Sequence, residues 1–247
     1  MDENYSGDTV RVEDDRVVFP KNNFSVAYSG PQMNVSDKYY VSPGGKTIHF
    51  AYEDRRPIVV KFDKGFLLQE LLDACLAVGV TYLPSSVVYD ASDNGSEVTL
   101  SLSSKGQHKE LIAQKVIAAD GVNTRVSEAL GLNKDRQLLA TALCVVYFME
   151  GVEVFENTAM KTYFGRAYQG LAPIMVGPSI HGKNICYVIC TGNQQYQPRA
   201  IFENVTTKGT LAWAFKNARI VKEVGCTLKT FNAMPVPWKG NALAIGD

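Results

Sequence analysis

The clearest periodic pattern in the chain lies in the stretch "DKGFLLQELLDACLAVGV". Apolar side chains recur there at three- and four-residue spacing from Phe66 to Val78, and the pattern stops at Gly79. It predicts a helix over about residues 64–79. The preceding stretch, 37–62, alternates around a Pro-Gly-Gly turn and predicts a hairpin followed by a further strand.

Three shorter strands are predicted after this helix. They cover residues 80–91, 96–104 and 110–120, and an Asp-Asn-Gly turn and the polar stretch "SKGQHK" connect them. Such short connections predict an antiparallel β-meander. The next stretch, "DGVNTRVSEALGL", predicts a single helical turn.

The pattern changes after Leu132, where the strands become longer and more apolar. Strands are predicted at residues 138–150, 159–166, 171–178 and 184–192. One helix is predicted at 207–224, from "TKGTLAWAFKNARIVKEV". These elements favour an α/β (α+β) fold with an antiparallel sheet under helical cover.

Two regions that are interleaved in the sequence follow from this change of pattern. The meander and its helix form one region, and the long strands form the other. Their expected ranges are 60–130 with 235–247, and 1–59 with 131–234.

The composition of the chain limits the kinds of molecule that we expect it to bind. The chain has 247 residues, and its 25 basic side chains balance 25 acidic ones. A zero net charge without basic clusters argues against nucleic acid as the main partner. The first ten residues are polar and acidic, and no stretch is long and apolar enough for a transmembrane helix, so we expect a cytoplasmic protein.

The five cysteines predict no disulfide framework and no metal site. Their number is odd, and the three histidines are scattered. Zinc would need a closer cysteine pair with further Cys or His partners. We expect the cysteines to serve as small apolar core residues in a reduced compartment.

The stretch "VIAADGVNTRV" carries the strongest candidate chemistry. An apolar strand ends at Asp120-Gly121, and a polar loop then leads toward a helix. A strand-to-helix turn of this kind presents a carboxylate and backbone N–H groups, which suit a sugar hydroxyl or a phosphate. An ordinary Asp-Gly turn explains the same residues.

The motif "ADGVNTRV" resembles the Asp-Gly motif of glutathione-reductase-type flavoproteins with the hydroxylase fold. It is similar above all to the geranylgeranyl reductase and electron-transfer-flavoprotein–quinone oxidoreductase branch, the FixC-like proteins. Thr124 stands where a serine is usual and keeps the hydroxyl, whereas Ser127 replaces the arginine that often closes the motif. The segment 55–80 and the final "ALAIGD" resemble two further family segments in the correct order.

The resemblance implies FAD as the cofactor and a partial FAD-binding domain with a β-meander beside an antiparallel-sheet substrate domain. The cofactor-binding positions that it implies are Lys64, Val88, Asp120, Gly121, Gly246 and Asp247. Lys64 falls at a usual arginine position and keeps its charge. In the family, the aspartate of the second motif binds a sugar-chain hydroxyl of FAD.

The resemblance also implies that both ends of the expected protein are missing. No glycine belongs to the Gly-x-Gly-x-x-Gly fingerprint with which the family opens, and the helix expected after Asp247 is absent. We therefore expect a fragment that by itself binds FAD weakly or not at all.

A substrate cavity is implied over the long-stranded sheet. The residues that would line it are Tyr163, Phe164, Tyr168 and Gly170. Ordinary aromatic packing on a sheet explains the same side chains.

The resulting hypothesis is a flavin-dependent oxidoreductase of the reductase or dehydrogenase class, acting on a small apolar substrate of isoprenoid or quinone-like character. Its electron donor would be NAD(P)H, ferredoxin or an electron-transfer flavoprotein, and peripheral membrane contact is compatible with such an enzyme. No catalytic acid, base or nucleophile is identified, because the flavin would supply the redox chemistry. The alternatives are a flavin-dependent aromatic hydroxylase and a non-catalytic remnant domain unable to hold FAD.

Overall fold

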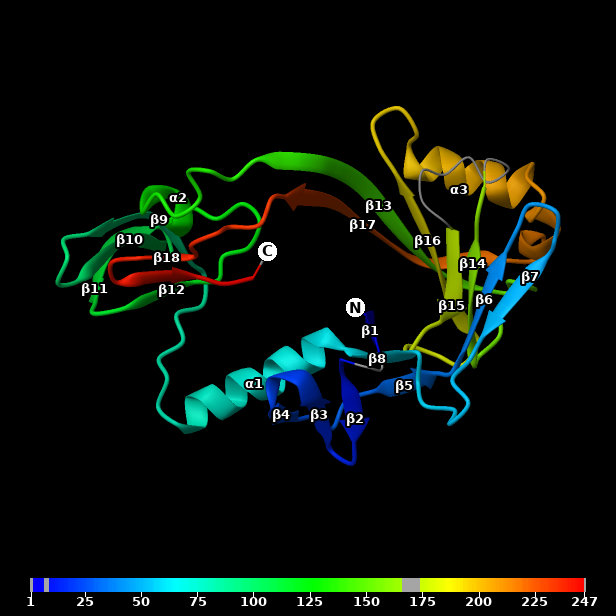
Figure 1. The fold of residues 1–247 in the computed structure, drawn as a ribbon, viewed down its shortest axis with the longest axis horizontal. Helices are drawn as coiled ribbons and strands as arrows, with labels where there is room; N and C mark the ends of the chain where they lie inside the picture. The colour runs from blue at the N-terminus through cyan, green and yellow to red at the C-terminus, as the bar shows by residue number, and fades with distance from the viewer. Residues whose placement is uncertain (1, 7–8, 166–173, 247) are drawn as a thin grey trace. The chain divides into compact units, whose positions relative to one another are not determined.

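The computed structural model describes residues 2–6, 9–165 and 174–246, and in this part strands predominate (Figure 1). The described helices are α1 (Lys64–Ala77), α2 (Val126–Ala129), α3 (Pro198–Thr207) and the short 3-10 helices η1 (Pro20–Asn22) and η3 (Ala212–Phe215). The strands are β1 (Asp2–Ser6), β2 (Arg11–Glu13), β3 (Arg16–Phe19), β4 (Phe24–Ala27), β5 (Gln32–Val35), β6 (Asp37–Val41), β7 (Thr47–Phe50), β8 (Val59–Asp63), β9 (Ser86–Asp93), β10 (Val98–Ser104), β11 (Gln107–Ala113), β12 (Val116–Ala118), β13 (Leu138–Glu150), β14 (Ala159–Tyr163), β15 (Ile174–Pro178), β16 (Ile185–Gly192), β17 (Arg219–Phe231), β18 (Trp238–Lys239) and β19 (Ala242–Ala244). The fold is mostly β with few helices. Within the described ranges, no helix has both the length and the apolar character needed to cross a bilayer.

The chain divides into two compact units that are interleaved in the sequence. The first unit is Met1–Gly79 with Ala142–Leu228, and the second is Val80–Thr141 with Lys229–Asp247. By its contacts α1 belongs to the first unit, whereas the sequence pattern groups it with the meander. The assignment of the two regions to cofactor and substrate stays a prediction.

A seven-stranded sheet is the main feature of the first unit. Its strand order is β17-β13-β16-β15-β14-β6-β7. The sheet is mixed rather than purely antiparallel, because β14 runs parallel to β6, with Ala159 opposite Asp37. The predicted hairpin in 37–62 is present as the antiparallel pair β6 and β7. The largest core cluster lies between this sheet and the helices α3 and η3.

The prediction of a helix over residues 207–224 is wrong. The covering helix α3 begins earlier, at Pro198, where a proline costs no hydrogen bond, and ends at Thr207. Helix α3 ends where the amides of Lys208 and Gly209 both donate to the Asn204 carbonyl. Residues 219–231 form β17 instead, since the β-branched side chains in "RIVKEV" favour an extended strand beside β13.

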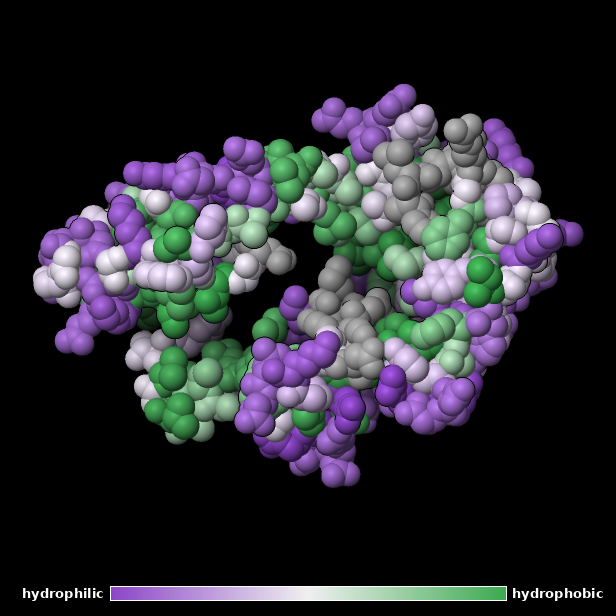
Figure 2. Space-filling model, viewed as in Figure 1, coloured by the Kyte–Doolittle hydropathy of each residue, from purple (hydrophilic) through white to green (hydrophobic). Residues whose placement is uncertain are grey.

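The helix predicted at 64–79 is present as α1, next to two small sheets, β1-β8-β5 and β2-β3-β4. The Asp63 carboxylate caps it by accepting from the Phe66 amide at 3.0 Å. Of its residues only Leu67 is buried, so much of its apolar surface faces outward, as the green surface along α1 shows (Figure 2). The exposed apolar side chains of this segment include Leu68 at 53% and Val78 at 81%.

The second unit contains the predicted meander, as the antiparallel sheet β11-β10-β9. The strand expected at 110–120 is two strands in two different sheets: β11 ends at Ala113, and β12 joins the sheet β12-β19-β18. Lys115 explains the break, because its Nζ donates to Asn241 Oδ1 at 2.5 Å, directly before the Val116 amide bonds to the Asn241 carbonyl. A compact apolar core joins the two sheets and α2.

Candidate functional site

The two glycine turns singled out in the sequence lie at the ends of neighbouring parallel strands. Strand β12 pairs with β19 in parallel register, with Ala118 opposite Ala244, and the Ile245 amide donates to the Ala118 carbonyl at 2.9 Å. Gly121 and Gly246 therefore follow strands that end side by side. Asp247 lies outside the described residues.

Both turns need glycine. Gly121 has φ +74° and Gly246 has φ +90°, a left-handed conformation that other L-residues adopt at a cost. A Cβ atom added at either position would meet no atom within 4 Å, so the space above each turn is open. The carboxyl ends of parallel strands are also where open α/β sheets bind ligands.

The Asp120 carboxylate organises the first of these turns. Its Oδ1 accepts from the Thr124 hydroxyl, and its Oδ2 accepts from the amides of Arg125 at 2.8 Å and Val126 at 3.2 Å. Burial disfavours the charged form, but hydrogen bonds from Thr124, Val126 and Arg125 outweigh burial and hold the pKa of Asp120 below its ordinary value. The carboxylate thus stays ionised and fixes the loop.

Distant residues anchor the loop after Asp120. Lys229 Nζ donates to Asn123 Oδ1 at 2.9 Å, and Arg136 donates to the Val122 carbonyl at 3.3 Å. The Arg136 guanidinium also lies over the Phe231 ring, 3.8 Å from its centroid. Sequence reasoning missed these contacts because the partners stand far apart in the chain, by 106 positions for Lys229 and Asn123.

An open pocket of about 300 Å³ lies against this loop. Its lining residues are Val122, Asn123, Thr124, Glu128, Asn133, Arg136 and Phe231. The lining combines an arginine, a carboxylate, a hydroxyl, amide groups and one aromatic ring, which is a composition suited to a polar ligand with a planar part.

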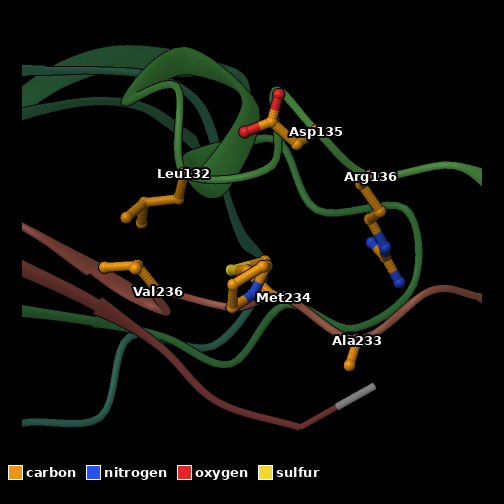
Figure 3. A pocket seen from close by; sticks show the side chains of 7 residues that line it. Leu132, Asp135, Arg136, Ala233, Met234 and Val236 are labelled. Atoms are coloured by element: carbon orange, nitrogen blue, oxygen red, sulfur yellow. The ribbon is translucent and has the colours of Figure 1, made fainter.

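A smaller hollow of about 90 Å³ shares Arg136 with that pocket. Figure 3 shows Leu132 and Val236 at one end of it, Met234 between them and the arginine, and Arg136 at the other end. Arg136 therefore stands between an apolar hollow and the Asp-Gly loop.

The two remaining predicted cofactor residues lie in different units. Val88 is half-buried and packs against the core cluster that also contains Ala118 of β12, so it lies in the unit of the two glycine turns. Lys64 is exposed at the first residue of α1, in the first unit.

The predicted substrate residues do not share one environment. Tyr163 is 3% exposed and belongs to the main core cluster. Phe164 is 40% exposed and stacks on Tyr40, with ring centroids 5.5 Å apart. Tyr168 and Gly170 lie outside the described residues. Of the predicted substrate residues that the structure describes, Phe164 is the one whose aromatic ring is exposed to solvent.

Comparison with known proteins supports the expectation that the chain comes from a flavoprotein. No family model matches the chain. The digeranylgeranylglycerophospholipid reductase of Methanococcus aeolicus is 29% identical over 128 residues, which cover 52% of this chain and 30% of that reductase. The matched region therefore spans about a third of this curated relative's length.

Two solved structures share the fold. A geranylgeranyl bacteriochlorophyll reductase-like protein from Thermoplasma acidophilum aligns with TM-score 0.71 and 16% identity, over 86% of this chain and 54% of that one. A flavin-dependent halogenase aligns with TM-score 0.66 and 15% identity, over 87% and 41%. The sequence match to the reductase and the structural matches to flavin enzymes point in the same direction. Together they support a relationship of this chain to the geranylgeranyl-reductase-like flavoproteins, which are flavin-dependent oxidoreductases. The FixC-like branch stays a prediction.

Proposed function

We propose that the chain belongs to a flavin-dependent oxidoreductase that reduces an apolar, isoprenoid- or quinone-like substrate, with FAD held at the paired turns of the second unit. The observation that carries this proposal is the parallel pairing of β12 and β19, which sets two open left-handed glycines side by side. The reductase name of the curated relative supports the substrate class.

The chain's own residues would bind and orient the cofactor. Gly121 and Gly246 let backbone groups approach a ligand closely, because no side chain blocks either turn. Asp120 already accepts three hydrogen bonds, so its main part is to hold the loop amides in place. Arg136 supplies a positive charge beside the loop. When bound, the flavin would accept and deliver the reducing equivalents.

Phe164 is the described residue that we assign to the apolar substrate. Its ring is 40% exposed and is held by stacking on Tyr40. A rigid, solvent-facing aromatic surface offers apolar contact area with little entropy to lose. Tyr163 supports the same strand from within the core.

A reductase is favoured over an aromatic hydroxylase because the curated match in sequence is to a reductase. Aromatic hydroxylases align in structure at 11% identity for p-nitrophenol 4-monooxygenase from Pseudomonas putida and at 17% for a hydroxylase from angucycline biosynthesis. A match at that level shows the fold alone.

Mapping of FAD by NMR on the 247-residue chain tests the cofactor site without requiring tight binding. Titration with FAD is expected to shift the amide resonances of residues 120–125 and 245–246, next to the two open turns. Shifts confined to other segments, or no shifts at millimolar FAD, would refute the assignment.

A pair of glycine variants sharpens this test. Gly121→Val places a branched side chain in the open space of the turn and is expected to abolish the FAD-induced shifts. Gly44→Val is the control, because Gly44 has no positive φ and no neighbouring atom within 4 Å of an added Cβ. Circular dichroism checks that both variants fold.

The substrate assignment has its own test. Phe164→Ala is expected to weaken binding of a short prenyl alcohol, measured by calorimetry, while leaving the FAD shifts unchanged. Phe24→Ala is the matched control, because Phe24 is 50% exposed and also stacks on a ring, that of Phe19 at 4.6 Å. Equal effects of both variants would contradict a substrate role for Phe164.

A further inference from the structure

The cysteines differ sharply in their environment, although the sequence suggests a common role as core residues. Cys186 and Cys190 are fully buried, and burial raises the pKa of each thiol to about 12. Cys226 is exposed instead, and Cys144 on the neighbouring strand is 8% exposed. All four residues lie in the first unit.

Strands β13 and β17 bring Cys144 and Cys226 together. They are neighbours in the seven-stranded sheet. A Cβ atom at Gly225 would lie 4.0 Å from Val145 Cγ2, which sets these two residues opposite each other. The strands run antiparallel, because the Asn232 amide donates to the Gln137 carbonyl at one end and Arg219 pairs with Glu150 at the other. With Gly225 facing Val145, Cys226 and Cys144 lie next to each other on the other face of the sheet.

Side-chain packing agrees with this placement. Val224, two residues before Cys226, packs in the same apolar cluster as Val146, two residues after Cys144, so the two cysteines face the same side of the sheet. From the next strand, the Thr191 hydroxyl approaches Cys144 Sγ at 3.9 Å. The three side chains therefore form one row across β17, β13 and β16. Cys190 is excluded from the row, because it lies opposite Val145 and faces the core.

We propose that Cys144 and Cys226 form a reversible disulfide when the protein meets a hydroperoxide. Directly opposed residues of antiparallel strands have Cα atoms about 4.5–5.5 Å apart. That spacing falls within the range of about 4.4–6.8 Å that disulfides require, so the bond needs no large movement of the strands.

The exposed thiol reacts first. The Cys226 thiolate attacks a peroxide oxygen, the O–O bond breaks, water leaves after protonation, and Cys226 becomes a sulfenic acid. Cys144 sulfur then attacks the sulfenic sulfur, the S–S bond forms, and the hydroxyl group leaves with a proton as a second water. Two thiols are oxidised, and one hydrogen peroxide is reduced to two waters. A dithiol reductant reverses the step by exchange.

The bond would join β13 and β17, which carry two of the three points where the chain passes between its units. β13 and β17 each begin in one unit and end in the other. A crosslink between them would limit their opening in solution. In a reducing compartment a disulfide of this kind is transient and redox-sensing.

Peptide mapping of the oxidised 247-residue chain tests the proposal. Trypsin yields residues 137–161 with Cys144 and residues 223–229 with Cys226, and each peptide contains one cysteine. After brief hydrogen peroxide treatment and alkylation without reductant, both free peptides should be lost and one crosslinked peptide should appear. Dithiothreitol should restore them.

Two variants complete the test. Cys226→Ser should abolish the crosslinked peptide, and Cys75→Ser should leave it unchanged, because Cys75 is also exposed but lies on α1. Oxidation of Cys226 to sulfinic acid without any crosslink would overturn the proposal. Crosslinks that join Cys226 to Cys75, or that appear only between two chains, would overturn it as well.

Discussion

Replacing Asp120 by alanine should destabilise the second unit through the loop that it caps. The carboxylate accepts from the Val126 amide, and Val126 is 6% exposed, so the variant leaves a buried donor without its partner. Such a loss costs about 1–3 kcal/mol. The Arg125 amide is exposed and finds water instead. Substitution of capping residues costs about 0.5–2 kcal/mol, so we expect a loss of about 2 kcal/mol in the free energy of unfolding.

Urea denaturation, followed by far-UV circular dichroism, measures this loss. Asp90→Ala is the matched control in the same unit, because the exposed Asp90 carboxylate accepts from the adjacent Ala91 amide at 2.9 Å and closes no loop. The control should stay within about 0.5 kcal/mol of the wild type. An Asp120→Ala variant as stable as the control would refute the capping argument.

The contribution of the Asp120 carboxylate to the free energy of unfolding should depend on pH. The folded-state pKa of Asp120 is lowered, so its contribution is fully present above the unfolded value of about 3.9. The contribution is lost as pH falls through the lowered folded pKa. The stability difference between the wild type and Asp120→Asn should therefore shrink in acid, and a difference that grew in acid would contradict the direction of the shift.

Three further variants test other contacts by the same urea measurement. Lys61→Met should cost about 1–3 kcal/mol, because Lys61 is fully buried and donates to a buried carbonyl, whereas Lys64→Met at an exposed position should be nearly neutral. Gly121→Ala should cost about 1–2 kcal/mol because of its positive φ, and Gly44→Ala should not. Arg136→Ala should cost about 0.5–2 kcal/mol through the lost ring contact and should broaden the loop resonances.

Elements with a strong local signal could be predicted from the sequence. Helix α1 has both the apolar spacing and the Asp63 cap, and the meander has its turn residues at the correct positions. The sequence singled out Gly121 and Gly246 through two separate motifs, and the parallel register of β12 and β19 brings the two turns side by side.

The errors arose where distant contacts decide the structure. The sequence pattern predicted residues 219–224 as the end of a helix, but their β-branched side chains favour an extended strand, and pairing with β13 fixes residues 219–231 as β17. The break between β11 and β12 depends on Asn241, which is 126 positions from Lys115. Lys229 likewise reaches Asn123 of the loop across 106 positions. No local pattern encodes such pairs.

The parallel pairing of β12 with β19 has a consequence for how the chain folds. Val116 must find Ala242, and the intervening chain includes the whole segment Ala142–Leu228 of the first unit. During synthesis, the core of the second unit therefore cannot close until residues 242–244 have left the ribosome. Contacts of such long sequence separation slow folding, and until they form the meander lacks the partner sheet that covers its core. The order of assembly should thus run from the local meander and α1 first to the paired glycine turns last.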